Sequence, residues 1–151
     1  MISGRVMNVL MVEDNSADAF LAQEAFGENS HRLRLHVVQD GEKGLRFLHR
    51  KPPFEDAPRP DLILLDLNLP RRTGKEVLTE IKSNPELSSV PVVVWTTSRA
   101  PDDVADSYNL HANAYITKPV DLDTFYELAQ KLVQFWFDVV TLPAAQKRGH
   151  R

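Results

Sequence analysis

Cysteine is absent from the 151-residue chain, which excludes disulfides and metal sites built on thiolates. Long hydrophobic runs are also missing, because the longest apolar stretches are far too short to span a bilayer. The first residues, M-I-S-G-R-V-M, lack the hydrophobic core of a signal peptide. Positive charge is not in excess either, since the formal net charge is −3, so nothing favours nucleic-acid binding. We therefore expect a soluble cytoplasmic protein with one domain of ordinary size.

Short apolar runs alternate along the chain with segments of helical periodicity. The runs typical of strands are 6–12, 33–38, 61–66, 92–95 and 114–117. The segments with helical spacing are 16–27, 42–51, 75–83, 102–110 and 121–140. In the first helix, Ser16 is the expected cap, and the residues expected on the buried face are Ala17, Phe20, Leu21, Ala25 and Phe26. Short, regular alternation of strands and helices predicts an α/β fold, a doubly wound sheet of five parallel strands with helices on both faces.

The central stretch is D-L-I-L-L-D-L-N-L-P, residues 61–70, in which a wholly apolar run leads to Asp66. Such a run fits a strand buried on both faces of a parallel sheet, with Asp66 at its carboxyl end. Other polar residues follow the other strands: Glu13 and Asp14 after the first, Thr96 after the fourth and Lys118 after the fifth. Since parallel strands end at one edge, these groups are predicted to meet there.

Three carboxylates brought close together repel one another unless a cation lies between them. Mg²⁺ fits the predicted group, because it prefers oxygen ligands and leaves coordination positions for water and a phosphate. A carboxylate can act as a nucleophile toward a phosphoryl group. An ammonium and a hydroxyl can stabilise the charge that phosphoryl transfer develops. The residue types at this edge therefore indicate Mg²⁺-dependent phosphoryl chemistry.

Four motifs in order carry a resemblance to a known family. They are V-E-D-N (12–15), L-L-D-L-N-L-P (64–70), W-T-T-S (95–98) and Y-I-T-K-P (115–119). With them, the chain from Val6 to Leu132 resembles the receiver domain of two-component response regulators. The resemblance implies a flavodoxin-like three-layer sandwich with strand order 2-1-3-4-5. One departure is Glu13, which stands where Asp is commoner in the family.

The resemblance also implies a role for each matching residue. Asp66 is the implied phosphoacceptor, and the implied metal ligands are Glu13, Asp14, Asp66 and the backbone carbonyl of Asn68. Lys118 and Thr96 are implied to bind the phosphoryl oxygens. Thr96 and Tyr115 form the implied conformational switch, in which Tyr115 rotates inward when Thr96 moves toward the phosphoryl group. Pro119 is implied to follow a cis peptide bond.

The end of the last helix carries the aromatic run F-W-F at 135–137, followed by further apolar residues. Successive residues of an α-helix point about 100° apart, so three consecutive aromatics do not fit one buried stripe. Exposed large apolar groups mark interfaces. We expect a homodimer built on this region and, near it, the 102–110 helix and the 114–117 strand. The residues predicted to take part are Phe135, Trp136, Phe137, Val140 and Leu142.

The same region, F-W-F-D-V-V-T-L-P, together with N-A-Y-I-T-K-P, resembles the stand-alone regulators that serve bacterial and cyanobacterial phytochromes. The resemblance implies a phytochrome-linked sensor histidine kinase as phosphodonor. We divide the chain into a receiver domain with an extended last helix (1–142) and a basic tail (143–151). The aspartates of the 102–110 helix are interpreted as a solvated face, and no histidine shows metal-ligand spacing.

The resulting hypothesis is a single-domain response regulator that accepts a phosphoryl group on Asp66 and signals through protein contacts, not an enzyme with turnover. The main alternative is a pseudo-receiver, which would bind partners without phosphorylation. A phosphatase with an aspartyl intermediate is disfavoured because Asn68 stands where a general acid is needed. A flavin-binding module is disfavoured because E-D-N, not a phosphate-cradling loop, follows the first strand.

Overall fold

The computed structural model describes residues 6–28 and 32–143, which form the predicted alternation of strands and helices. The strands are β1 (Met7–Val12), β2 (Leu33–Val38), β3 (Leu62–Leu65), β4 (Val92–Thr96) and β5 (Ala114–Thr117). The helices are α1 (Ser16–Gly27), α2 (Gly41–Leu48), α3 (Gly74–Ser83), α4 (Pro101–Asn109), α5 (Leu122–Gln134) and the π-helix η1 (Phe135–Val139). In this part of the chain, no helix combines the length and the apolar character that crossing a membrane requires.

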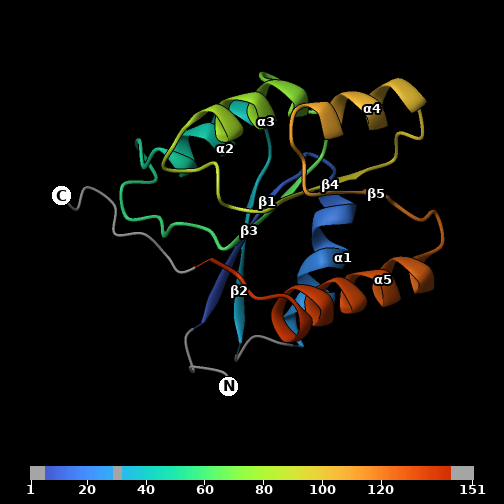
Figure 1. The fold of residues 1–151 in the computed structure, drawn as a ribbon. Coiled ribbons are helices and arrows are strands. Elements are labelled where there is room, and N and C mark those ends of the chain that lie inside the picture. Colours follow the sequence, from blue (N-terminus) through green and yellow to red (C-terminus); the bar gives the residue numbers. More distant parts are fainter. Residues whose placement is uncertain (1–5, 29–31, 144–151) are drawn as a thin grey trace.

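All five strands are parallel and lie in the order β2-β1-β3-β4-β5, so the predicted fold is confirmed. Helices α1 and α5 pack on one face of the sheet, whereas α2, α3 and α4 lie on the other (Figure 1). The order reverses between β1 and β3, whose strands both end at the same edge. In open α/β sheets this reversal is where ligands bind.

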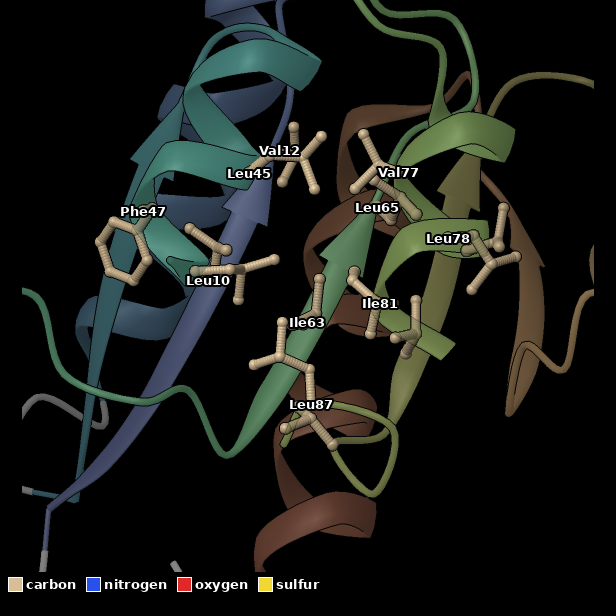
Figure 2. Packing of buried hydrophobic residues seen from close by; sticks show 14 of the residues in the cluster. Leu10, Val12, Leu45, Phe47, Ile63, Leu65, Val77, Leu78, Ile81 and Leu87 are labelled. Atoms are coloured by element: carbon tan, nitrogen blue, oxygen red, sulfur yellow. The ribbon is translucent and has the colours of Figure 1, made fainter. Parts of the chain in front are cut away.

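Alternating side chains of the central strands supply two apolar cores. Leu10 and Ile63 point toward α2 and α3, where they meet Leu78 and Ile81 (Figure 2). Their neighbours along the strands point to the opposite face and pack against α1 and α5. Because both faces are covered, β3 and β4 are buried along their whole length, as expected for parallel strands. The central strands therefore form a rigid base for the residues that follow them.

The start of α1 differs from the sequence prediction. The cap is Asn15, not Ser16, because the Asn15 side chain accepts a hydrogen bond from the backbone N–H of Asp18. Ala17 and Phe20 face outward, with 59% of Phe20 exposed. The buried residues are Ala19, Ala22, Ala25 and Phe26, so the prediction is confirmed for Ala25 and Phe26. The helix is turned so that Ala19 and Ala22, and not Ala17 and Phe20, face the core.

The aromatic run after α5 also differs from the prediction, because Trp136 and Phe137 are buried in the core that α1 and α5 share. Here the helix widens into a π turn, closed by a hydrogen bond from the Val140 N–H to the Phe135 carbonyl. A π turn spaces successive side chains by a smaller angle than an α-helix, so two neighbouring aromatics share one face. Only Phe135 of the three faces solvent. Their assignment to a dimer surface was therefore wrong for Trp136 and Phe137.

Candidate functional site

The carboxyl ends of β1 and β3 bring three carboxylates together. Glu13 and Asp14 follow β1, Asp66 follows β3, and one oxygen from each lies within 4.8 Å of the others. Glu13 and Asp66 are almost fully buried, whereas Asp14 is exposed. The cluster therefore has a buried base and an open side toward solvent. This is the group that the sequence predicted at this edge.

The ammonium of Lys118 lies in the same cluster, although β5 is not adjacent to β1 or β3. Its Nζ is 2.5 Å from Glu13 Oε1, 3.0 Å from Asp66 Oδ2 and 2.9 Å from Asp18 Oδ2. Lys118 is itself buried, and its backbone N–H donates to the Thr96 carbonyl, which fixes the loop after β5. The lysine thus links the first, third and fifth strand ends to the start of α1.

Backbone groups hold the two buried carboxylates in place. Asp66 Oδ1 accepts a hydrogen bond from the Asn68 N–H at 3.1 Å, and Glu13 Oε2 accepts one from the Asn15 N–H at 3.1 Å. Each side chain is therefore oriented by the loop that follows its own strand. The other oxygen of each carboxylate faces the Lys118 ammonium, so each of the two carboxylates has a partner at both of its oxygens.

Burial determines the protonation behaviour of this cluster. Removal from water raises the pKa of Glu13 to about 7, against the opposing effect of the Lys118 ammonium. For Lys118, burial by itself lowers the pKa, but hydrogen bonds to Glu13 and Asp18 and the charge of Asp66 outweigh it and hold the pKa above its ordinary value. The ammonium is therefore charged at neutral pH.

The carboxylates fit a hard divalent cation. Their oxygens are close enough to share one ion, and oxygen ligands are those that Mg²⁺ and Mn²⁺ prefer. Glu13 Oε1 is buried and, apart from Lys118, has no hydrogen-bond donor among the described residues. A cation would neutralise the repulsion between these groups, which one ammonium offsets only in part.

Thr96 ends β4 beside the cluster and begins a chain of hydrogen bonds toward α4. Its side chain is fully buried, and its Oγ1 accepts a hydrogen bond from the Ser98 N–H at 3.4 Å. The Ser98 hydroxyl donates to Asp103 of α4 at 2.5 Å, and the Tyr115 hydroxyl donates to the Ser98 carbonyl at 2.9 Å. Thr96 and Tyr115 are thus both joined to Ser98.

A lysine from α3 completes this network. Lys75 Nζ lies 2.8 Å from Asp103 and 2.9 Å from Asp106, so it ties α3 to the first two turns of α4. These two aspartates were interpreted from the sequence as part of a solvated face. Their side chains are 30% and 52% exposed, so they do lie at the surface, but the sequence did not predict their pairing with Lys75 or the hydrogen bond from Ser98 to Asp103.

The structure contradicts the prediction for Pro119 and leaves the one for Asn68 untested. The Lys118–Pro119 peptide is not cis, since the cis bond found in the described residues joins Pro52 to Pro53. Trans is the more stable form of an X–Pro bond, by about 0.5–1 kcal/mol. For Asn68, the structure places its N–H on Asp66; the role of its carbonyl stays a prediction.

Asp18 is the member of this cluster that sequence reasoning missed. It lies in the first turn of α1, whereas Asp14 precedes the cap of that helix, so helical spacing does not relate the two. The motifs did not indicate Asp18 either, because it lies outside the V-E-D-N run at 12–15.

Comparison with known proteins places the chain in one family. The response regulator receiver domain matches residues 9–130. The response regulator Rcp1 of Synechocystis sp. is 47% identical over 137 residues, which cover 91% of this chain and 93% of Rcp1.

Two solved structures are similar over nearly their whole length. The Mn²⁺-bound form of Rcp1 superimposes with a TM-score of 0.87 at 46% identity, covering 91% of this chain and 99% of that one. The phosphorylated cyanobacterial phytochrome response regulator RcpA gives a TM-score of 0.90 at 43% identity, covering 93% of this chain and all of that one. The four motifs, the strand order and these matches agree: the chain belongs to the receiver domain family of response regulators, the signalling proteins of two-component systems.

Proposed function

We propose that Asp66 accepts a phosphoryl group from a phosphohistidine. The observation that supports this most directly is the position of its carboxylate, held by the Asn68 N–H on one oxygen and 3.0 Å from the Lys118 ammonium on the other. In the transfer, an Asp66 oxygen forms a bond to phosphorus while the bond from phosphorus to the imidazole nitrogen breaks. The electron pair of the broken bond stays with the imidazole. Hydrolysis of the aspartyl-phosphate by water then restores the carboxylate and releases inorganic phosphate.

The remaining residues of the site stabilise charge and orient the phosphoryl group. Lys118 supplies a compact positive charge, and Thr96 supplies a hydroxyl that can donate to a phosphoryl oxygen. Glu13, Asp14, Asp66 and the carbonyl of Asn68 would hold Mg²⁺. When bound, the ion neutralises negative charge on the carboxylates and the phosphoryl oxygens. The related Rcp1 has been solved in a Mn²⁺-bound form, which supports a divalent metal as the ion that this acidic cluster would hold.

Output would pass through Thr96. When its hydroxyl turns toward a phosphoryl oxygen, it gives up the Ser98 N–H, and the Ser98 loop is released together with the hydrogen bond from Tyr115. Tyr115 is half-buried against the core on the α2 and α3 side, and in this proposal its ring rotates further inward once Thr96 has moved. Phosphorylation biases an equilibrium between two arrangements that both exist beforehand.

The phosphodonor in this proposal is a sensor histidine kinase linked to a phytochrome. The likeness to a phytochrome response regulator over the whole of that chain supports this choice. A kinase phosphorylates its own histidine with ATP, so the proposed partner also implies the cytoplasm.

We further propose a homodimer through α5 and η1. Its surface is smaller than the sequence predicted, since Trp136 and Phe137 belong to the core. Phe135 and Val139 are 51% and 70% exposed on η1, while Val140 and Leu142 are only partly buried. Exposed apolar side chains on adjacent turns support an interface.

The test is the intact mass after incubation with acetyl phosphate and Mg²⁺. We expect wild type to gain one phosphoryl group, and expect no gain with EDTA or in Asp66→Asn. The matched control is Asp56→Asn, an exposed loop aspartate, which should gain the group as wild type does. No gain by wild type would favour the alternative, a receiver that binds partners without phosphorylation.

A further inference from the structure

The Lys118 ammonium has three carboxylate partners, but only two of them belong to the metal cluster. Glu13 and Asp66 contact both the ammonium and the place that a cation would take. Asp18 contacts the ammonium at 2.9 Å and is not a member of the metal cluster. Its side chain is 22% exposed, against 1% for Glu13 and 8% for Asp66, so it is the partner nearest to solvent.

The first turn of α1 holds Asp18 in this position. The Asn15 side chain accepts a hydrogen bond from the Asp18 N–H at 3.0 Å, which fixes the turn, and Asn15 is itself bonded to Glu13. The position of the Asp18 carboxylate is therefore set by the same loop that carries the metal ligands. A negative charge in the first helical turn is also favoured by the helix dipole.

The three partners change differently when a cation binds. A lysine ammonium has three N–H donors. Here the Lys118 ammonium donates hydrogen bonds to Asp18 and Asp66 and forms an ion pair with Glu13. A cation on Glu13 and Asp66 would neutralise their charge and repel the ammonium, which sits on a flexible four-carbon stem. Asp18, which is not in the metal cluster, would keep its full charge and remain available to the ammonium. It is the partner that can hold Lys118 at the site while the other two N–H groups turn to phosphoryl oxygens.

We propose that Asp18 is a positioning residue that holds the Lys118 ammonium toward the phosphoryl group on Asp66 when the metal is bound. The proposal rests on the proposed phosphoryl transfer and adds a residue to it. Asp18 acts through Lys118 and does not contact the phosphoryl group itself.

The test compares Asp18→Asn with Asp18→Glu and with Asp123→Asn, an exposed aspartate in the first turn of α5. The first readout is the rate of phosphoryl uptake from acetyl phosphate with Mg²⁺ in excess. The second is the affinity for beryllofluoride, an inorganic phosphoryl analogue, measured by calorimetry on Mg²⁺-loaded protein. Loss of one charge-assisted hydrogen bond predicts that Asp18→Asn weakens beryllofluoride binding about tenfold and slows uptake to a similar extent. Asp18→Glu should recover part of both, and Asp123→Asn should match wild type.

A double-mutant cycle with Lys118→Met separates positioning from a general effect of charge. If Asp18 acts through Lys118, Asp18→Asn has no further effect on beryllofluoride affinity once the ammonium is gone. An equal effect in both backgrounds would overturn the proposal. Uptake and affinity equal to those of wild type in Asp18→Asn would also overturn the proposal. Faster uptake in Asp18→Asn would overturn it as well, because it would mean that Asp18 draws Lys118 away from the phosphoryl group. In each of these cases the proposed function of Asp66 would stand. If wild type takes up no phosphoryl group, the proposed function fails and the role of Asp18 with it.

Discussion

Gly74, the first residue of α3, lies directly against the backbone of Asp66. A Cβ added to Gly74 would come 2.2 Å from the Asp66 carbonyl oxygen and 2.6 Å from the Leu67 Cα. The neighbouring atoms are backbone, so a side chain here must displace either α3 or the loop that carries Asp66, the proposed phosphoacceptor. Thr73 caps α3 with a capping box to Glu76, which fixes the helix start at this place.

Gly74→Ala is therefore expected to disturb the site through the backbone. Overpacking of this kind costs about 1–3 kcal/mol of unfolding free energy. We expect a loss of this size in urea denaturation, together with slower phosphoryl uptake. Gly27→Ala is the control, because a Cβ there meets no atom within 4 Å. Wild-type uptake and stability in Gly74→Ala would show that the loop can move without consequence.

The raised pKa of Glu13 predicts how the stability of the metal-free protein depends on pH. Its pKa is about 7 in the folded chain and 4.5 in the unfolded chain. Between these pH values the folded state binds more protons than the unfolded state. The stabilising contribution of Glu13 is therefore fully present below about pH 4.5 and is lost as the pH rises through 7. The loss is on the order of 3 kcal/mol.

The measurement is urea denaturation of wild type and Glu13→Gln between pH 5 and 8 in EDTA. The pKa of His36 is lowered by burial and by Arg34, so its contribution has the opposite sign, present above its ordinary pKa and lost on acidification. Subtracting the unfolding free energy of Glu13→Gln from that of wild type at each pH cancels the contribution of His36 and leaves that of Glu13. Parallel curves for the two proteins would contradict the expectation.

Lys75 is predicted to restrain α4. Hydrogen bonds to Asp103 and Asp106 raise the pKa of Lys75, so the lysine is charged at every ordinary pH. Lys75→Met removes both pairs, and we expect severalfold faster amide exchange in α4 but not in α5, because local openings follow local contacts. Lys131→Met, on an exposed position of α5, is the control. Unchanged exchange over residues 101–109 would mean that other contacts hold the helix.

The aromatic run predicts two different outcomes from neighbouring residues. Trp136→Ala should lower the unfolding free energy by about 3–5 kcal/mol, as for other buried aromatics. Phe135→Ser should leave stability nearly unchanged but weaken the proposed dimer, measured by sedimentation over a range of concentrations. If Phe135→Ser dimerises as wild type does, or if wild type is a monomer at all concentrations, the interface proposed on η1 is wrong.

Much of the fold could be predicted because its signals are local. Uninterrupted apolar runs at 62–65 and 92–95 indicate strands buried on both faces, and the polar residue after each run, Asp66 or Thr96, marks the candidate site's edge of the sheet. The cluster of Glu13, Asp14, Asp66 and Lys118 follows from topology alone, since parallel strands end together.

The details that could not be predicted depend on tertiary contacts. Asn15 and Ser16 are both good caps, and only the path of the chain after β1 decides between them. The π turn that buries Trp136 beside Phe137 has no period that a sequence pattern reveals. The partners of Lys118 and Lys75 come from distant elements, so no spacing along the chain indicates Asp18 or Asp103 as a partner.

The ammonium of Lys118 joins residues that are 100 positions apart in the sequence. A chain synthesised only as far as β4 already contains the proposed phosphoacceptor and the acidic cluster but has no lysine to meet them. Because a domain folds as a unit and α5 supplies part of the core, we expect a chain that ends before β5 neither to fold nor to accept a phosphoryl group.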